Sequence, residues 1–116
     1  MKSPQINNED NHLLNKPFSF SKLITYQENS IVSKTIMDQA EGTITLFAFD
    51  KGQQLSEHTA PFHALVQIIE GQAKIKIAEN FFDLKAGQSI IMPANIPHAV
   101  SAQDQFKMLL TMIRSK

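Results

Sequence analysis

Two histidines, His58 and His98, stand beside proline-containing turns, in the stretches EHTAP and NIPH. A neutral imidazole is a frequent ligand of divalent metals and also a general base near neutral pH. Forty residues separate the two side chains, so only the fold can bring them to one point. The chain has no cysteine, and a metal bound here would therefore be held by imidazole, carboxylate, amide or water.

A third histidine, His63, lies five residues after His58 and directly before the apolar run ALVQII. If that run is a strand in which Ala64 points inward, His63 points outward, because neighbouring side chains of a strand lie on opposite faces. A β-bulge after Pro61 would reverse the orientation and make His63 a third ligand. Without the bulge, His63 is a surface histidine or a dimer contact. The nearest carboxylate, Glu57, is expected to face away from His58 into solvent.

The length and charge of the chain limit its partners. With 116 residues, the chain is long enough for one domain with one hydrophobic core. Eleven basic residues balance eleven acidic ones, which argues against binding of nucleic acid or of an anionic membrane. No segment approaches the roughly 18 apolar residues of a membrane span, and the N-terminus lacks the apolar core of a signal peptide. We therefore expect a cytoplasmic protein whose partner is a small molecule.

Short segments rich in Ile, Val, Phe and Thr follow one another from residue 17 onward and predict an all-β fold, since each is closed by Gly, Asn or Pro. Residues 1–16 are polar and rich in asparagine, and we expect them to form a mobile arm before a single domain over residues 17–116. His12 lies in this arm, where no neighbouring groups would hold it in a fixed geometry.

Two central segments have clear strand patterns. Residues 43–49 place bulky side chains on both faces, as expected for a strand between two sheets. Residues 73–84 predict a hairpin that turns at Glu79-Asn80, because Asn tolerates positive φ.

The C-terminal third predicts a strand over residues 89–92, a turn over residues 93–97 and a strand from His98. A closing strand follows in residues 105–116. Four of its apolar side chains share one face, and we interpret them as core rather than as ligand-lining residues: Phe106, Met108, Leu110 and Met112. Short strands at this spacing are typical of a β-sandwich or barrel.

The pattern over about residues 43–113 resembles the cupin superfamily, whose two motifs are G(X)5HXH(X)3-4E(X)6G and G(X)5PXG(X)2H(X)3N. Six residues match at the family's spacing, with Gly52, His58 and Gly71 in the first motif and Gly87, Pro93 and His98 in the second. The resemblance implies a single-domain cupin barrel, which is a double-stranded β-helix or jelly roll. It also implies a homodimer that pairs through N-terminal strands, here supplied by residues 18–37.

The departures from the motifs concern the metal ligands. The family's second histidine falls on Ala60 and its glutamate on Ala64, neither of which binds a metal. The inner glycine of the second motif is Asn95, which still tolerates positive φ. Of the four ligands that the resemblance implies, His58 and His98 remain.

Two functions stay open. In the first, His58 and His98, with or without His63, hold a divalent metal that binds a small molecule at the barrel mouth. Imidazoles without a carboxylate favour Zn, Ni or Cu, whereas Fe or Mn would want oxygen ligands. In the second, a metal-free barrel or sensor binds the small molecule through hydrogen bonds from the histidines, and His98 could act as a general base. Soft or aromatic side chains would then form the pocket walls, namely Phe47, Phe49, Met92 and Met108. The sequence does not reveal whether the protein is an enzyme.

Overall fold

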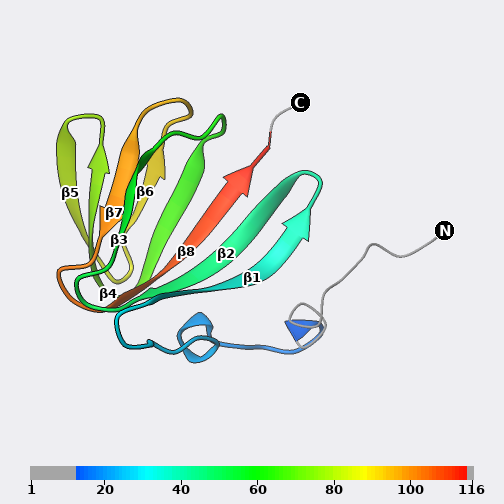
Figure 1. The fold of residues 1–116 in the computed structure, drawn as a ribbon. Helices are drawn as coiled ribbons and strands as arrows, with labels where there is room; N and C mark the ends of the chain where they lie inside the picture. Colours follow the sequence, from blue (N-terminus) through cyan, green and yellow to red (C-terminus); the bar gives the residue numbers. More distant parts are fainter. Residues whose placement is uncertain (1–12, 115–116) are drawn as a thin grey trace.

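Eight β-strands and one short 3-10 helix make up residues 13–114, the part of the chain that the computed structural model describes (Figure 1). This confirms the all-β barrel expected from the sequence. The elements are η1 (Phe20–Lys22), β1 (Ile31–Gln39), β2 (Gly42–Phe49), β3 (Gln54–His58), β4 (Ala64–Ile77), β5 (Asn80–Lys85), β6 (Ser89–Met92), β7 (His98–Ser101) and β8 (Phe106–Ile113). No helix in these residues is long and apolar enough to cross a membrane. His12 and most of the predicted arm lie outside the described residues.

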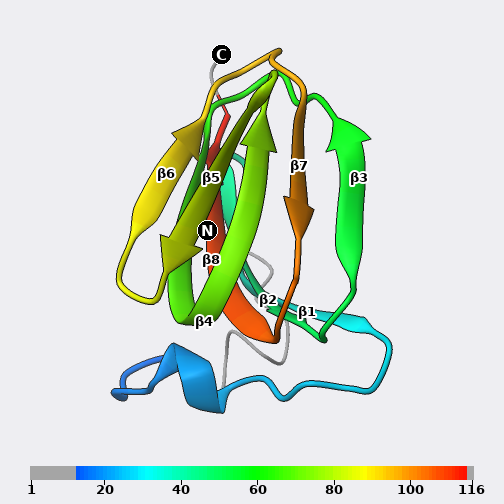
Figure 2. The same ribbon diagram turned by 90° about the vertical axis from the view of Figure 1, so that its left-hand side faces the viewer.

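The strands follow the order β1-β2-β8-β4-β7-β3, and β5 and β6 also pair with β4. Strand β4 belongs to both sides of the barrel, because residues 64–71 pair with β6 and β8 whereas residues 72–77 pair with β5 and β7. The bend falls at Gly71, where φ is +77°. As a result, both ends of β4 lie at the end of the barrel where β3 and β6 finish and β7 starts, which we call the mouth (Figure 2).

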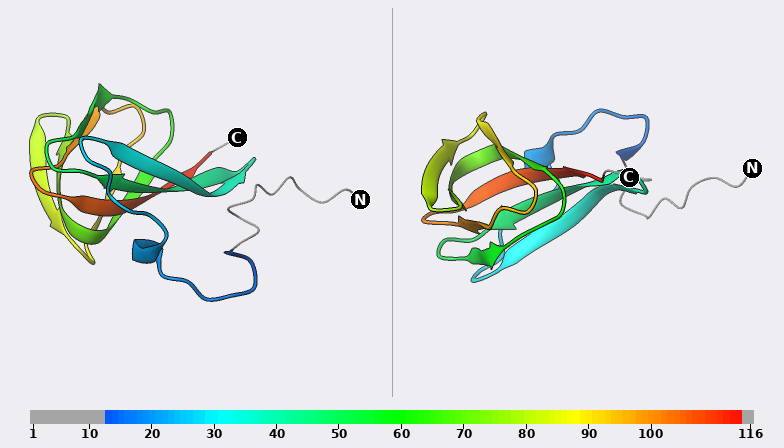
Figure 3. Two further views of the ribbon diagram at one scale, coloured as in Figure 1. Left: turned by 60° about the horizontal axis from the view of Figure 1, so that its bottom comes forward. Right: turned by 90° about the horizontal axis from the view of Figure 1, so that it is seen from above.

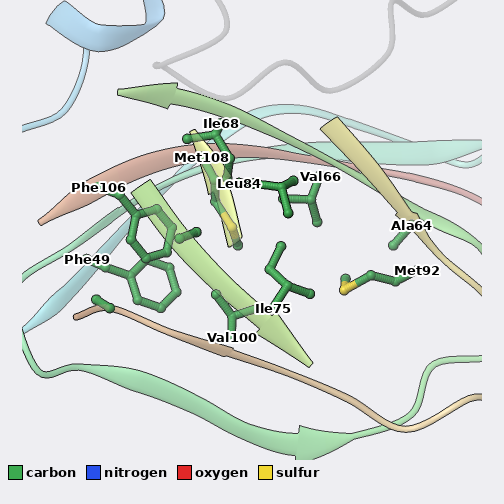
Figure 4. Packing of buried hydrophobic residues seen from close by; sticks show 12 residues of the cluster. Phe49, Ala64, Val66, Ile68, Ile75, Leu84, Met92, Val100, Phe106 and Met108 are labelled. Atoms are coloured by element: carbon green, nitrogen blue, oxygen red, sulfur yellow. The ribbon is translucent and has the colours of Figure 1, made fainter. Parts of the chain in front are cut away.

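The barrel interior is filled by a cluster of buried apolar side chains. Phe49 and Phe106 stack with ring centroids 4.5 Å apart at the end nearest the Gly71 bend. Ala64 and Met92 occupy the opposite end of the cluster (Figure 4). The cluster consists of Phe49, Ala64, Val66, Ile68, Ala73, Ile75, Leu84, Met92, Val100, Ala102, Phe106 and Met108. The predicted inward face of β8 is therefore confirmed.

A second cluster covers the outer face of β1, β2 and β8. Its buried members are Ile24, Ile36, Leu46, Ala48 and Leu109. Residues 13–26, which we call the strap, run across this face (Figure 3). The strap contributes Leu13, Phe20, Leu23 and Tyr26 to the cluster. Strand β2 is thus buried on both faces, as its alternation predicts.

Lys107 fastens the strap to the sheet. Its side chain is buried, and its Nζ donates to the Ser21 carbonyl at 2.6 Å and lies 3.5 Å from the Glu70 carboxylate. The same ammonium lies 5.0 Å from the centre of the Tyr26 ring, whose hydroxyl donates to Glu70 at 2.7 Å. Burial raises the pKa of Tyr26, and the bond to Glu70 raises it further, so the phenol keeps its proton as a donor.

Lys107→Ala is expected to lower the free energy of unfolding by about 2–3 kcal/mol, because it leaves Glu70 without its cation and the Ser21 carbonyl without its donor. Lys76→Ala is the matched control, since Lys76 and Glu57 form an exposed pair that contributes below about 1 kcal/mol. Urea denaturation followed by circular dichroism measures both. Equal losses in the two variants would contradict a buried anchor at Lys107.

Residues 18–37 supply one strand, which is most of β1, while residues 13–26 pack as the strap over their own barrel. One local expectation was wrong. The turn of the β4-β5 hairpin lies at Ala78 and Glu79, with φ of +52° at Ala78, whereas Asn80 already pairs with Ile77. The expected positive φ at Asn95 is confirmed, at +65°.

Candidate functional site

His58 and His98 meet at the mouth. His58 ends β3 and His98 begins β7, and the two residues face each other in the antiparallel pairing of these strands. Their Nε2 atoms lie 3.2 Å apart, and the rings meet edge to face at an angle of 72°. The fold thus joins the two histidines that the motif spacing selects.

Backbone carbonyls fix the tautomer of both rings. Nδ1 of His58 lies 2.7 Å from the Ser56 carbonyl oxygen, and Nδ1 of His98 lies 3.2 Å from that of Ile96. A carbonyl only accepts, so each Nδ1 is the donor. When both rings are neutral, both Nε2 atoms therefore present a lone pair to the same point, and neither has a proton to give the other. A metal ion, or a ligand that donates hydrogen bonds to the Nε2 atoms, would remove the repulsion between the two lone pairs.

The two rings differ in their contact with water. His98 is 3% exposed, whereas His58 is exposed to solvent. Burial lowers the pKa of His98, and the nearby His58 lowers it further against the opposing effect of the Ile96 carbonyl. The buried ring is therefore held neutral, which is the form that binds a metal or accepts a hydrogen bond.

Acid is expected to destabilise the protein through His98. Because its folded pKa is depressed, the unfolded chain takes up a proton near pH ~6.5 while the folded chain does not, so stability falls as the pH drops from about 6.5 through the folded pKa. Urea denaturation at a series of pH values, with a chelator present, should show a weaker acid loss in His98→Gln. The same pH dependence in both proteins would contradict this role.

The pair fits two corners of a metal site. In a tetrahedral zinc site with nitrogen atoms about 2.0–2.1 Å from the ion, neighbouring nitrogens are about 3.3 Å apart, close to the separation of the two Nε2 atoms. Each ring also donates its other N–H to a backbone carbonyl, which is how metal-binding histidines are usually oriented. Within residues 13–114, no third His, Cys, Asp or Glu joins them. Ala64 is buried in the core, and Glu57 is paired with Lys76 at 3.1 Å.

His63 does not reach this pair. It lies outside the barrel, where its Nδ1 accepts the Ala94 N–H at 2.9 Å. Its side chain lines a groove of about 540 Å³ on the outer face, together with Phe62 and Ile91. The strand alternation at Ala64 therefore holds, because Ala64 is buried in the core whereas His63 lines the outer groove.

The predicted pocket walls are divided between the two ends of the barrel. Met92 is buried beside Ala64 at the mouth. Phe49 stacks on Phe106 at the far end, and Met108 lies between the two ends (Figure 4). Phe47 packs against the cluster from β2. Met92 is thus the predicted wall residue best placed for a ligand at the mouth.

Two residues near the histidines were not anticipated as part of the site. Ile77 pairs with His98, and Met112 pairs with Ala64, so both side chains border the mouth. The alternation of the closing strand placed Met112 on the inner face. Its nearness to the mouth depends on the register between β8 and β4, which the sequence pattern does not contain.

Comparisons with known proteins agree with this geometry. The family model of the cupin domain matches residues 45–114, more than half of the chain. A conserved protein of unknown function from Streptococcus pyogenes is 33% identical, with a TM-score of 0.84 over 88% of this chain and 90% of that one. A cupin superfamily protein from Desulfitobacterium hafniense is 28% identical, with a TM-score of 0.83 over 87% of this chain and 93% of that one.

A third similar structure is a cupin 2 conserved barrel domain protein from Leptotrichia buccalis, which is 39% identical, with a TM-score of 0.78 over 81% of this chain and 46% of that one. A search of curated proteins found no match. The family match and the identity to the streptococcal protein over most of both chains establish that this chain belongs to the cupin family.

Proposed function

We propose that this cupin binds a small molecule at the mouth of its barrel through a divalent metal held by His58 and His98. The observation that carries the proposal is the convergence of two Nε2 lone pairs, 3.2 Å apart, on rings whose Nδ1 atoms both face backbone carbonyls. Neutral imidazole donors without a carboxylate favour Zn, Ni or Cu. A bound ion of this kind supplies a Lewis acid and lowers the pKa of its coordinated water.

The chain's own residues would shape the site around that ion. His98 is held neutral by burial and is oriented by Ile96, so it offers a fixed donor from the wall of the barrel. His58 offers a second donor from the exposed side. Ile77 pairs with His98 and places an apolar side chain next to the two histidines, which suits a ligand with an apolar part. The predicted cytoplasmic location is part of this proposal.

A metal-free binding barrel is the second candidate. It is favoured by the count of ligands, since only two donors converge in the described residues and alanines take the family's other two positions. Here both Nε2 atoms would accept hydrogen bonds from a ligand with hydroxyl or ammonium groups. With a chelator present, such ligands should raise the melting temperature in proportion to the logarithm of their concentration.

Elemental analysis of untagged protein tests the first candidate. After dialysis against trace mixed divalent metals, the wild type should retain about one ion per chain, whereas the His58→Ala, His98→Ala double variant should retain almost none. His63→Ala is the matched control and should keep the metal, because its ring lies in the outer groove. Negligible metal in all three proteins would contradict the proposal and leave the metal-free barrel.

A further inference from the structure

A β-bulge in β3 decides which way His58 points. Leu55 packs against the apolar cluster inside the barrel, so its side chain lies on the inner face of β3. His58 also turns inward, toward His98, although it lies three positions further along the strand. In a regular strand, side chains three positions apart lie on opposite faces. The pairing of β3 with β7 shifts its register between Leu55 and His58, as the inward orientation of both side chains requires.

The two bulged residues are Ser56 and Glu57, which together stand opposite the single residue Ala99 of β7. The Ser56 carbonyl oxygen lies 2.7 Å from Nδ1 of His58, so the bulge also fixes the tautomer of this ring. Glu57 reaches past the small side chain of Ala99 and forms an ion pair at 3.1 Å with Lys76, which pairs with Ala99 from β4. The bulge is thus tied to the long central strand from outside the barrel.

A regular pairing of β3 would exchange the orientations of Glu57 and His58. Glu57 would then stand opposite His98 and point into the mouth, whereas His58 would point into solvent. Within residues 13–114, β3 pairs with β7 alone and stands at the edge of the sheet (Figure 2). The ion pair forms only with the bulge present, because Lys76 lies on the outer face and an inward Glu57 would face away from it.

We propose that Lys76 is a positioning residue, which selects through Glu57 the arrangement of β3 in which His58 faces His98. The consequence for metal binding rests on the proposed function, whereas the orientation of His58 does not. An exposed ion pair shifts an equilibrium between two such arrangements by up to about fivefold. Loss of the pair therefore leaves the barrel folded and lowers the fraction of chains that have both imidazoles at the mouth.

Engineered cysteines measure the orientation without any metal, because the chain contains no cysteine of its own. Directly paired residues of antiparallel strands have Cα atoms about 4.5–5.5 Å apart, which a disulfide spans. His58→Cys with His98→Cys should therefore form a disulfide within one chain. In a glutathione buffer, its equilibrium constant should fall about threefold to fivefold when Lys76→Met is added, because fewer chains then hold residue 58 inside the mouth.

Two further variants of the cysteine protein separate the ion pair from a simple loss of charge. Lys74→Met is the matched control and should leave the equilibrium unchanged, because Lys74 and Lys76 both lie 5.8 Å from the centre of the Phe81 ring but the ion pair of Glu57 is with Lys76. Exchange of the two charges, by Glu57→Lys with Lys76→Glu, should restore the disulfide. No loss with Lys76→Met, an equal loss with Lys74→Met, or no recovery on exchange would overturn the proposal.

Zinc affinity tests the consequence in the protein that keeps both histidines. Removal of a positive charge by itself favours a bound cation. Competition with a coloured chelator should nevertheless show about threefold to fivefold weaker binding in Lys76→Met than in the wild type or Lys74→Met. High salt should reduce this difference, because it screens the exposed pair. If the disulfide equilibrium shifts but the zinc affinity does not, His58 is not a zinc ligand, and the proposed function fails while the positioning role of Lys76 stands.

Discussion

A glutamate in place of Ala64 is expected to make the stability of the fold depend on a divalent metal. Ala64 is 1% exposed and pairs with Met92 and Met112 at the mouth. A carboxylate there loses its hydration without gaining a partner, which should cost about 3–5 kcal/mol in the absence of metal. With zinc present, the carboxylate joins His58 and His98, and the lost stability should return because binding is coupled to folding.

Thermal unfolding of Ala64→Glu with zinc and with a chelator measures this effect. Ala73→Glu is the matched control, because Ala73 is equally buried but lies two residues from the Gly71 bend, away from the histidines. Both variants should melt early in chelator, and only Ala64→Glu should recover with zinc. Recovery of both variants, or of neither, would count against a metal position between His58, His98 and Ala64.

Valine in place of Gly71 is expected to prevent folding. A Cβ at this position would overlap the Gln105 carbonyl oxygen and lie 2.9 Å from Cα of Phe106, and the φ of +77° is unfavourable for any β-branched residue. Both obstacles are backbone atoms, so no side chain can move aside. The expected loss exceeds about 5 kcal/mol, which is comparable with the whole stability of a small domain.

Gly87→Val is the control that measures the cost of a positive φ without a steric overlap. Gly87 has a φ of +91°, but no atom lies within 4 Å of a Cβ built there. Its replacement should cost about 1–3 kcal/mol and leave a folded protein. Soluble yield and circular dichroism compare the two variants. A folded Gly71→Val protein would mean that β4 can bend elsewhere, and that the approach to Gln105 is not required.

The barrel and the central pair of the site were predictable because they depend on local signals. Glycines and prolines mark where strands end, and alternation reveals which side chains share a face. With the motif spacing, these signals placed His58 and His98 at strand ends on the same rim. The alternation at Ala64 left His63 either outward or, with a bulge, inward as a third ligand, and the structure places it in the outer groove.

The features that could not be predicted depend on contacts between segments that are far apart in the sequence. The strap contains Leu23, Ile24 and Tyr26, residue types that are common in strands. It packs as a cover because β2 and β8 have an apolar outer face that would be exposed to solvent without it. A row of paired residues on the outer face crosses five strands, so it exists only once the register of each pair is known: Ile91, Leu65, Thr111, Ile44 and Met37. The turn at Ala78 shows the same limit on a smaller scale, since Asn80 has the better intrinsic preference for positive φ.

The position of β8 between β2 and β4 has a consequence for how the protein is made. During synthesis β2 appears early, yet its second edge has no partner until β8 has left the ribosome, and β3 must wait for β7. Only the β1-β2 and β4-β5 hairpins join strands that are neighbours in sequence and pair at once. The nascent chain therefore exposes apolar strand edges, which favour aggregation, for most of its elongation. We therefore expect the barrel to close late in synthesis. Until then, cellular factors rather than the fold itself must keep the growing chain from aggregating.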